Sequence, residues 1–261
     1  MTIEYTYAEI AGTIDHALLH PTLSADELIL GCALAAVYET ATVCVKPCDV
    51  KRAAELLESS KAEVCTVVGF PHGANLTEVK VMETKRACDQ GATEVDMVIN
   101  IGKVMSGDWQ YVEQDIHAVS ETAHSSNAKL KVIFENDYLR NGGGGLSGDE
   151  LKRKVCQICE NAKADWVKTS TGFGYARQSD GTMATLGATV KDVTLMVDAC
   201  TKGTQVKAAG GVKTLRTLLR MRKIGATRIG TSSTRVILDE CREMLGLPPL
   251  PFEMELSTSE Y

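Results

Sequence analysis

Three lysines and one aspartate lie inside short apolar runs, where a charged side chain is costly to bury unless it is paired. Asp96 lies in "TEVDMVIN", Lys131 in "KLKVIFEN", Lys168 in "DWVKTSTG" and Lys207 in "TQVKAAGG". A lysine attacks a carbonyl only when it is neutral, and burial or a neighbouring ammonium lowers its pKa from the ordinary value of about 10.4. Lys207 beside Lys168 would keep one amine neutral by staying charged, while Asp96 moves protons. Such a set suits Schiff-base cleavage of a carbon–carbon bond.

The runs that carry these residues are expected to be strands of one parallel sheet. Runs rich in β-branched residues at 12–19, 41–47, 63–71, 93–100, 129–136, 165–172, 204–211 and 227–233 alternate with segments of helical spacing. One such segment, 187–200, is expected to turn Lys191, Asp192 and Asp198 outward. Near-continuous apolar strands joined by helices indicate a parallel sheet buried on both faces. Eight such units predict a single (β/α)8 barrel over residues 1–246, followed by a flexible tail over residues 247–261.

In such a barrel the active site lies at the carboxyl ends of the strands. Lys46 is expected to extend to solvent there. The glycine-rich segment 141–150 has no P-loop lysine and is expected to be a flexible loop after the fifth strand, and no dinucleotide-binding glycine pattern follows the first. The charged residues at strand ends or within strands are Asp15, Lys46, Asp96, Lys131, Glu135, Lys168 and Lys207.

The last two strands carry a second pattern, which predicts phosphate binding. Gly210 and Gly211 follow the seventh strand, and Gly230, Ser232 and Ser233 accompany the eighth. In many barrels the backbone N–H groups of these two loops bind phosphate, with a helix N-terminus nearby. Either glycine group alone is equally compatible with an ordinary turn. Together, on consecutive strands, they favour a phosphate site.

The composition sets limits on partners and compartment. The net charge of -6 gives the surface no general attraction for nucleic acid or anionic lipid. We expect no signal peptide and no membrane span, because the sequence has neither a basic, apolar leader nor an apolar run of about 18 residues. Nine scattered cysteines, an odd number, favour reduced thiols in a cytoplasm. Cys156 and Cys159 form a CxxC, but they lie in an expected amphipathic helix without further ligands, which favours buried packing over a metal or redox site.

Six segments together resemble one known family. They are "IDHALLHP", "VVGFPHG", "EVDMVINIG", "VKTSTGFG", "GATVKDVTLM" and "VKAAGGVKT", and the likeness extends from Thr13 to about Leu238. The family is that of the deoxyribose-phosphate aldolases. The resemblance implies a (β/α)8 barrel that uses no metal and no cofactor. It also implies reversible cleavage of 2-deoxy-D-ribose 5-phosphate to D-glyceraldehyde 3-phosphate and acetaldehyde.

Carried over by position, the resemblance implies roles for individual residues. Lys168 would form the imine, Lys207 would perturb it, and Asp96 would transfer protons. Tyr261 would reach the active site and help to move a proton. The remaining positions would be secondary active-site polar groups (Asp15, Cys44 and Lys131) and contacts to the substrate and its phosphate (Thr171, Gly210, Gly211, Gly230, Ser232 and Ser233).

Some positions depart from the family pattern and leave the substrate range open. Ala17 and His20 replace the usual threonine and lysine, and the segment 135–148 is altered and glycine-rich. A transaldolase- or thiolase-like Schiff-base barrel acting on another sugar phosphate is one alternative. A non-catalytic sugar-phosphate-binding barrel is another, although Lys168, Lys207 and Asp96 argue against it. The expected partners are small sugar phosphates and aldehydes rather than nucleic acid or membrane, and self-association as a homodimer stays open.

Overall fold

The computed structural model describes residues 5–177 and 181–252, and within these ranges parallel strands close into a barrel in chain order. The barrel strands are β1 (Ile14–Leu18), β2 (Thr42–Val45), β3 (Glu63–Val68), β4 (Glu94–Val98), β5 (Lys129–Ile133), β6 (Trp166–Lys168), β9 (Gln205–Ala209) and β10 (Arg228–Thr231). Because β10 pairs with β1, no sheet edge is left open. The predicted (β/α)8 fold is confirmed, and each predicted run contains one of these strands.

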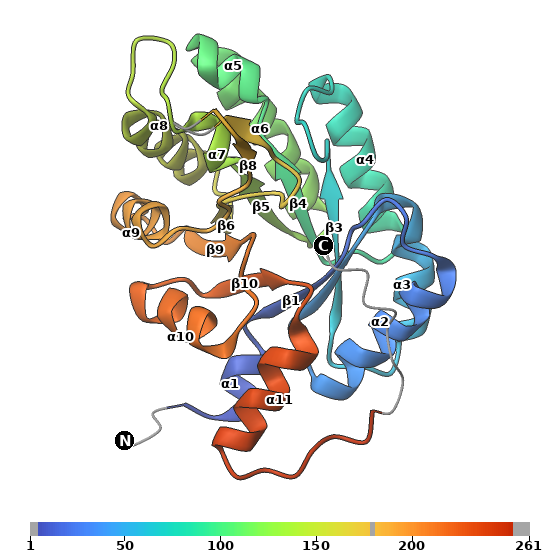
Figure 1. The fold of residues 1–261 in the computed structure, drawn as a ribbon. Coiled ribbons are helices and arrows are strands. Elements are labelled where there is room, and N and C mark those ends of the chain that lie inside the picture. The colour runs from blue at the N-terminus through green and yellow to red at the C-terminus, as the bar shows by residue number, and fades with distance from the viewer. Residues whose placement is uncertain (1–4, 178–180, 253–261) are drawn as a thin grey trace.

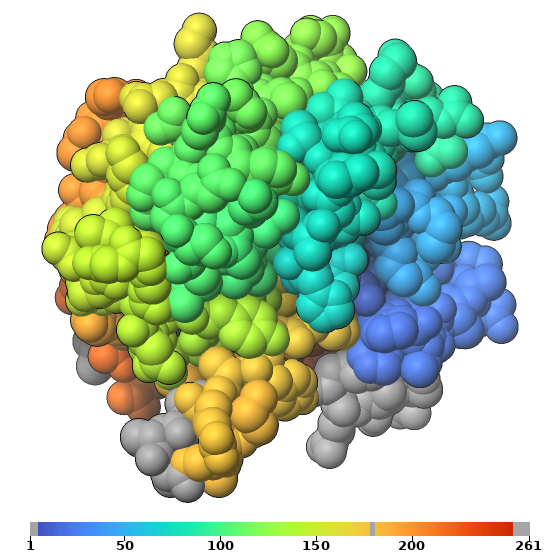
Figure 2. Space-filling view, turned by 90° about the horizontal axis from the view of Figure 1, so that it is seen from above, coloured from blue at the N-terminus to red at the C-terminus, as the bar shows by residue number. Residues whose placement is uncertain are grey.

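Helices before, between and after the strands surround the barrel (Figure 1). They are α1 (Tyr7–Ala11), α2 (Ala25–Tyr38), the 3₁₀ turn η1 (Pro47–Asp49), α3 (Val50–Leu57), α4 (Thr77–Asp89), α5 (Ile101–Ser106), α6 (Trp109–Ser125), α7 (Asn136–Leu139), α8 (Gly148–Asn161), α9 (Val190–Ala199), α10 (Leu215–Ile224) and α11 (Thr234–Met244). In the space-filling view, the green segment that includes α6 lies at the centre of the face, with the teal segment of α4 on one side and the yellow-green segment of α8 on the other (Figure 2). No helix of the described ranges is both long and apolar enough to cross a bilayer.

The glycine-rich segment 141–150 is more ordered than a flexible loop. Gly143 and Leu146 form a β-bridge, and Ser147 begins α8 with a capping box completed by Glu150. Gly142 has a positive φ of 76°, and a Cβ there would lie 2.4 Å from the Leu146 carbonyl oxygen. Glycine is therefore required at this tight turn.

Two further features differ from the sequence-based expectation. Asp192 of α9 was expected to face outward but is buried, and it accepts a 2.5 Å hydrogen bond from Lys152 of α8. The prediction for Asp192 is wrong because a charged residue in an amphipathic helix is expected at the surface, and its partner Lys152 is 40 positions away in the sequence. A short antiparallel hairpin, β7 (Ala176–Arg177) with β8 (Met183–Ala184), lies between β6 and α9 and was not predicted.

The inside of the barrel is filled by side chains from alternate strands, as in other barrels of this class. Such layers usually contain valine, isoleucine and leucine, but here most inward positions are polar and all except Gly230 are buried. From the amino toward the carboxyl end of the strands, the layers are Thr42, Glu94, Trp166 and Arg228, then Asp15, Cys65, Lys131 and Lys207, then Cys44, Asp96, Lys168 and Gly230.

Candidate active site

Asp96 is the centre of the buried polar interior. Its Oδ2 accepts hydrogen bonds from Lys168 Nζ at 2.7 Å and from Lys207 Nζ at 2.8 Å. Its Oδ1 accepts from Lys131 Nζ at 2.8 Å. The convergence predicted for the three lysines is therefore observed, and two of the amines share one carboxylate oxygen. Register explains this, because Asp96 pairs with Lys131 across β4 and β5, and Lys168 pairs with Lys207 across β6 and β9.

The three amines differ in how many carboxylates hold them. Lys131 lies 2.6 Å from Glu94, 2.8 Å from Asp96 and 3.5 Å from Asp15. Lys207 contacts both Asp15 and Asp96. Among the described residues, the ion pairs of Lys168 include only the one with Asp96. Lys168 is thus the least constrained amine, and it stands at the carboxyl end of β6.

The charges of this interior do not balance. Among the described residues, the ion pairs of Lys131, Lys168, Lys207 and Arg228 go to three carboxylates, Asp15, Glu94 and Asp96. A fourth buried carboxyl, Glu135, is near enough for Lys168 to act on its pKa, but burial raises that pKa and favours the uncharged form. Each unpaired buried charge is costly. An arrangement with one cation in excess therefore favours the loss of one proton or the arrival of an anionic ligand. Lys168, with a single carboxylate partner, is the amine of the cluster that opposite charge holds least.

The pKa shifts in this network follow from burial opposed by opposite charge. Burial alone would raise the pKa of Asp96, but Lys131, Lys168 and Lys207 hold it well below its ordinary value. Burial would lower the pKa of Lys207, but Asp15 and Asp96 outweigh it and raise that pKa above its ordinary value. Lys207 is therefore a fixed cation beside Lys168, which is the role expected of it. Asp96 is a fixed anion in the resting site.

Residues missed by the sequence analysis complete the network. Arg228 donates to Asp15 at 2.6 Å and to both oxygens of Glu94 at 3.0 Å, and its guanidinium lies 4.9 Å from the ring centroid of Trp166. Glu94 precedes Asp96 by two positions, so strand periodicity alone would have placed both on the inner face. Cys65, which contacts Asp96 Oδ1 at 3.3 Å, is missed because a cysteine in an apolar run reads as core.

Asp15 and Thr171, both predicted active-site positions, occupy different levels of the site. Asp15 is buried below the lysines, where it accepts from Thr42 at 2.8 Å as well as from Arg228. Thr171 lies just beyond β6, and its hydroxyl donates to Glu135 Oε2. Burial raises the pKa of Glu135, and its Oε1 has no hydrogen-bond partner within the described ranges. Glu135 thus adds an incompletely satisfied carboxyl group next to the Lys168 strand.

The predicted phosphate positions gather where β9 and β10 end. Gly210 and Gly211 have positive φ angles of 95° and 76°, and Ser232 and Ser233 lie at the start of α11, where Ser233 makes no side-chain cap hydrogen bond. Ser232 is exposed and Ser233 is half-buried. Gly230 lies lower, within β10, where a Cβ would come 3.2 Å from Lys207 Cε and 2.9 Å from Ala209 Cβ. Its missing side chain makes room for Lys207.

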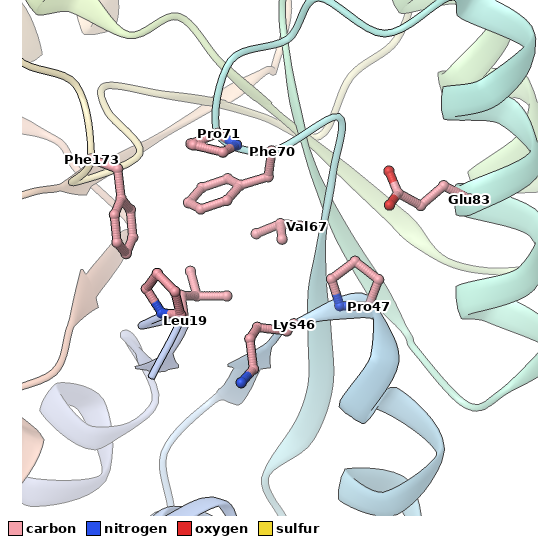
Figure 3. Close-up of a pocket in the computed structure, with 9 residues that line it drawn as sticks. Leu19, Lys46, Pro47, Val67, Phe70, Pro71, Glu83 and Phe173 are labelled. Carbon is pink, nitrogen blue, oxygen red and sulfur yellow. The ribbon is translucent and has the colours of Figure 1, made fainter. Parts of the chain in front are cut away.

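A cavity of about 320 Å³ opens at the carboxyl ends of β1 to β3 (Figure 3). The rings of Phe70 and Phe173 meet edge to face with centroids 5.5 Å apart. Lys46, expected to extend to solvent, lines the edge of the cavity, with Nζ 3.1 Å from the Leu23 carbonyl oxygen. The lining is mainly apolar and comprises Leu19, Pro21, Lys46, Pro47, Val67, Phe70, Pro71, Glu83 and Phe173.

Among the residues that the structure describes, two clusters have donor atoms close enough to hold a metal ion. One is formed by Cys44, Cys65 and Asp96, and the other by Asp15, Cys65 and Glu94. Both lie within the network of lysine and arginine cations described above, which opposes binding of a further cation. Cys156 and Cys159 are buried in α8, as expected of packing residues. Tyr261 lies outside the described residues.

Comparison with known proteins places this geometry in a family. Residues 10–240 match the model of the "DeoC/LacD family aldolase". The chain is 43% identical over 247 residues to the deoxyribose-phosphate aldolase of Rhodopirellula baltica, with 95% of each chain covered. It also resembles the crystal structure of a putative deoxyribose-phosphate aldolase from Coccidioides immitis, with a TM-score of 0.80, 36% identity and 91% and 87% of the two chains covered. A tetrameric deoxyribose phosphate aldolase from Aeropyrum pernix matches with a TM-score of 0.78, 26% identity and coverage of 92% and 93%.

Proposed function

Since this chain belongs to the DeoC/LacD family of aldolases, we propose that it cleaves 2-deoxy-D-ribose 5-phosphate reversibly to D-glyceraldehyde 3-phosphate and acetaldehyde. The reaction is that of an aldehyde-lyase and serves deoxyribose phosphate catabolism. The observation that carries the proposal is the shared carboxylate, on which Lys168 and Lys207 bond the same oxygen of Asp96. Such an arrangement holds a nucleophilic amine, a fixed cation and a proton carrier in one place.

Lys168 is the nucleophile in this mechanism. Its neutral amine adds to the aldehyde carbon of the open-chain sugar, and the resulting carbinolamine loses water to give an iminium. The iminium accepts the electron pair of the C2–C3 bond as that bond breaks, and the C3 hydroxyl gives its proton to the Asp96 carboxylate as glyceraldehyde 3-phosphate leaves. Protonation of the enamine at C2 and hydrolysis of the imine then release acetaldehyde and restore Lys168.

Asp96 and Lys207 move and balance the protons of these steps. Asp96 takes up a proton when Lys168 gives one up and returns it to the departing hydroxyl. Lys207, held charged by Asp15 and Asp96, disfavours a second ammonium beside it. Lys131 and Asp15 fix Asp96 and Lys207 from below, and Cys44 adds a polar wall to the substrate space. Thr171 would contact the substrate beside Lys168.

The substrate phosphate binds at the ends of β9 and β10 in this proposal. Gly210 and Gly211 let the backbone approach the phosphate oxygens closely, Ser232 and Ser233 add donors at the N-terminus of α11, and Gly230 admits Lys207 below them. In Ser233→Asp the new carboxylate repels each negative charge of the phosphate dianion by about 1–4 kcal/mol. We expect KM for the phosphorylated sugar to rise at least about tenfold, with cleavage of free deoxyribose much less affected. Equal losses on both sugars would place the phosphate elsewhere.

We propose that Tyr261 carries a proton to the enamine carbon. A phenol with a pKa near 10 can relay a proton through water to a lysine. Deleting Tyr261 should slow cleavage and slow the exchange of acetaldehyde methyl protons, while imine formation at Lys168 stays nearly intact. Exchange at the parent rate in the truncated protein would remove Tyr261 from the mechanism.

We also propose that the chain self-associates, at least as a homodimer, in a cytoplasm. The nine free cysteines suit a reducing compartment, and an apolar strip at α4, formed by Leu76, Val79 and Met82, is 44–68% exposed. Light scattering should give a mass above 28.1 kDa, and Met82→Glu should lower it. A monomer in the unsubstituted protein would contradict the proposed assembly.

The activity is tested by measuring acetaldehyde release from 2-deoxy-D-ribose 5-phosphate in the presence of a strong chelator. We expect turnover to be unaffected by the chelator, because the amine supplies the electrophilic activation. Other pentose and hexose phosphates serve as matched substrates under the same conditions. Release from one of these with none from deoxyribose 5-phosphate would replace the proposed substrate, and no release from any of them would contradict the proposed activity.

A further inference from the structure

The barrel interior contains two neighbouring cysteines, and the mechanism above does not require a pair of thiols. Cys44 of β2 and Cys65 of β3 are partners in the parallel register, and both are buried, with exposures of 2% and 0%. Their Sγ atoms and a carboxylate oxygen of Asp96 all lie within 4.8 Å of one another. Neighbouring strands lie about 4.8 Å apart, which falls inside the Cα separation of about 4.4–6.8 Å that a disulfide needs.

The surroundings of the two thiols make them unequal. The neighbouring Cys65 side chain lowers the pKa of Cys44 against the opposing effects of burial and of Asp96, and Lys207 and Lys168 act in the same direction as Cys65. Burial raises the pKa of Cys65 well above its ordinary value. Cys44 therefore has the greater thiolate character, and Cys65 keeps its proton. A nucleophilic thiol beside a protonated one is the pairing that a redox-active dithiol requires.

The two thiols lie directly behind the lining of the cavity at the barrel mouth. Cys44, Cys65 and Val67 form one buried cluster against which Leu19 and Phe70 pack. The same Leu19, Val67 and Phe70 line the 320 Å³ cavity, and in Figure 3 Phe70 and Val67 lie together at its centre. One wall of that cavity thus separates the thiols from the opening.

We propose that Cys44 and Cys65 form a disulfide in response to hydrogen peroxide and that this modification switches the aldolase off reversibly. The Cys44 thiolate attacks one peroxide oxygen, the O–O bond breaks, and the hydroxide released takes the proton that Cys44 lost. The Cys65 sulfur then attacks the sulfenic sulfur of Cys44. The S–S bond forms, the S–O bond breaks, and the hydroxyl leaves as water with the Cys65 proton. Two thiols and one peroxide give one disulfide and two waters.

The disulfide acts on Asp96 directly. Cys65 Sγ lies 3.3 Å from Asp96 Oδ1 and 3.3 Å from Lys131 Nζ. Two sulfur atoms joined at about 2.05 Å cannot both keep their present positions, and the bridged Cys65 has no proton to donate. The carboxylate shared by Lys168 and Lys207 therefore loses a hydrogen bond and its fixed position. Because even a displacement of about 1 Å in a catalytic group can cost about 100-fold in rate, we expect turnover to fall by at least about tenfold.

The test compares the whole protein with Cys65→Ser, whose hydroxyl keeps the donor to Asp96, and with Cys32→Ser, which changes a buried cysteine of α2 outside the site. Each protein is treated with peroxide, alkylated and digested without reduction, and its activity is divided by that of its own untreated sample. In the parent and in Cys32→Ser we expect a Cys44–Cys65 linked peptide, an activity loss of at least about tenfold, and recovery of both by dithiothreitol.

Cys65→Ser lacks the second thiol, so Cys44 should proceed to the sulfinic acid, and dithiothreitol should restore no activity. If Cys65→Ser does not fold, Cys65→Ala takes its place with the same expectation. Inactivation with both thiols still alkylatable would overturn the proposal, as would a linked peptide in a fully active protein or full recovery of the Cys65 variant.

The effect on turnover rests on the aldolase function proposed above, whereas the linked peptide is measured without substrate. A linked peptide in a protein that releases no acetaldehyde before treatment would contradict the function and leave the dithiol in place. Acetaldehyde release without any linked peptide would contradict the dithiol alone.

Discussion

Buried lysines occur in two regions of this protein, and the regions differ in how the charge is balanced. In the helix layer, Lys80 pairs with Asp115 at 2.6 Å and Lys152 pairs with Asp192 at 2.5 Å. Each of these amines is matched mainly by one buried carboxylate. Inside the barrel, four cations share three carboxylates, and Lys168 has the fewest partners among them.

The comparison shows that burial and a lowered pKa do not by themselves identify a catalytic amine. Burial lowers the pKa of Lys80 in spite of Asp115, yet Lys80 also donates to the Val98 carbonyl at 2.9 Å and lies between α4 and the sheet. Nothing in that position needs a neutral amine. An excess of positive charge at the carboxyl end of the strands distinguishes Lys168, and this property belongs to the cluster rather than to one residue.

The largest effect, a loss of kcat, is expected from removing the Lys168 amine, which lies beside the excess positive charge. Lys168→Met should lower kcat by a factor on the order of 10⁴ or more, as loss of a nucleophile does in other enzymes. Stability should not fall, because three cations would then face three carboxylates. Steady-state kinetics and thermal unfolding measure the two effects, with the exposed Lys191→Met as the control. If Lys168→Met kept a tenth of the parental kcat, Lys168 would not be the nucleophile, and the contrast between the barrel lysines and the helix-layer lysines would fail.

In the helix layer the same kind of substitution should act on stability instead. Lys80→Met leaves Asp115 buried without its partner, which costs about 3–5 kcal/mol of unfolding free energy. The double variant Lys80→Met/Asp115→Leu should regain most of that loss, because both charges are gone. Denaturant unfolding gives the free energies, and kcat measured on the folded fraction should stay near the parental value. A specific loss of kcat in the double variant would mean that Lys80 contributes to catalysis.

The smallest effect concerns the pH dependence set by Lys207. The Asp15 and Asp96 carboxylates hold the pKa of Lys207 above its ordinary value, so its positive charge is present throughout the working range. Lys207→Leu removes that charge, and deprotonation of Lys168 then needs a higher pH. We expect the acid limb of the kcat/KM profile to move up by about one unit, since one pKa unit corresponds to about 1.4 kcal/mol. An unshifted profile with full activity would exclude Lys207 from the mechanism.

The sequence predicts the strands and the convergence of the lysines because both follow from local pattern. Asp96, Lys131, Lys168 and Lys207 each lie in an apolar strand, and neighbouring parallel strands bring their ends together. The pairing of Arg228 with Glu94, 134 positions apart, has no local signal. The same holds for Asp192, whose burial depends on Lys152 of another helix.

A second class of feature escapes prediction because it depends on close packing. Gly230 resembles the phosphate-loop glycines in the sequence, but its position beneath them shows only when the Lys207 side chain is placed. The Cys44 and Cys65 pair likewise depends on the register of β2 and β3. Register is fixed by the whole barrel and not by either strand.

The central claim is that Lys168, and not its better-paired neighbours, forms the covalent bond to the substrate. Treating the protein with 2-deoxy-D-ribose 5-phosphate and borohydride reduces the imine to a stable secondary amine, and peptide mass mapping then locates it. The account predicts a single adduct on Lys168, with activity lost in proportion to labelling. An adduct on Lys207 or Lys131, with Lys168 unmodified, would contradict it.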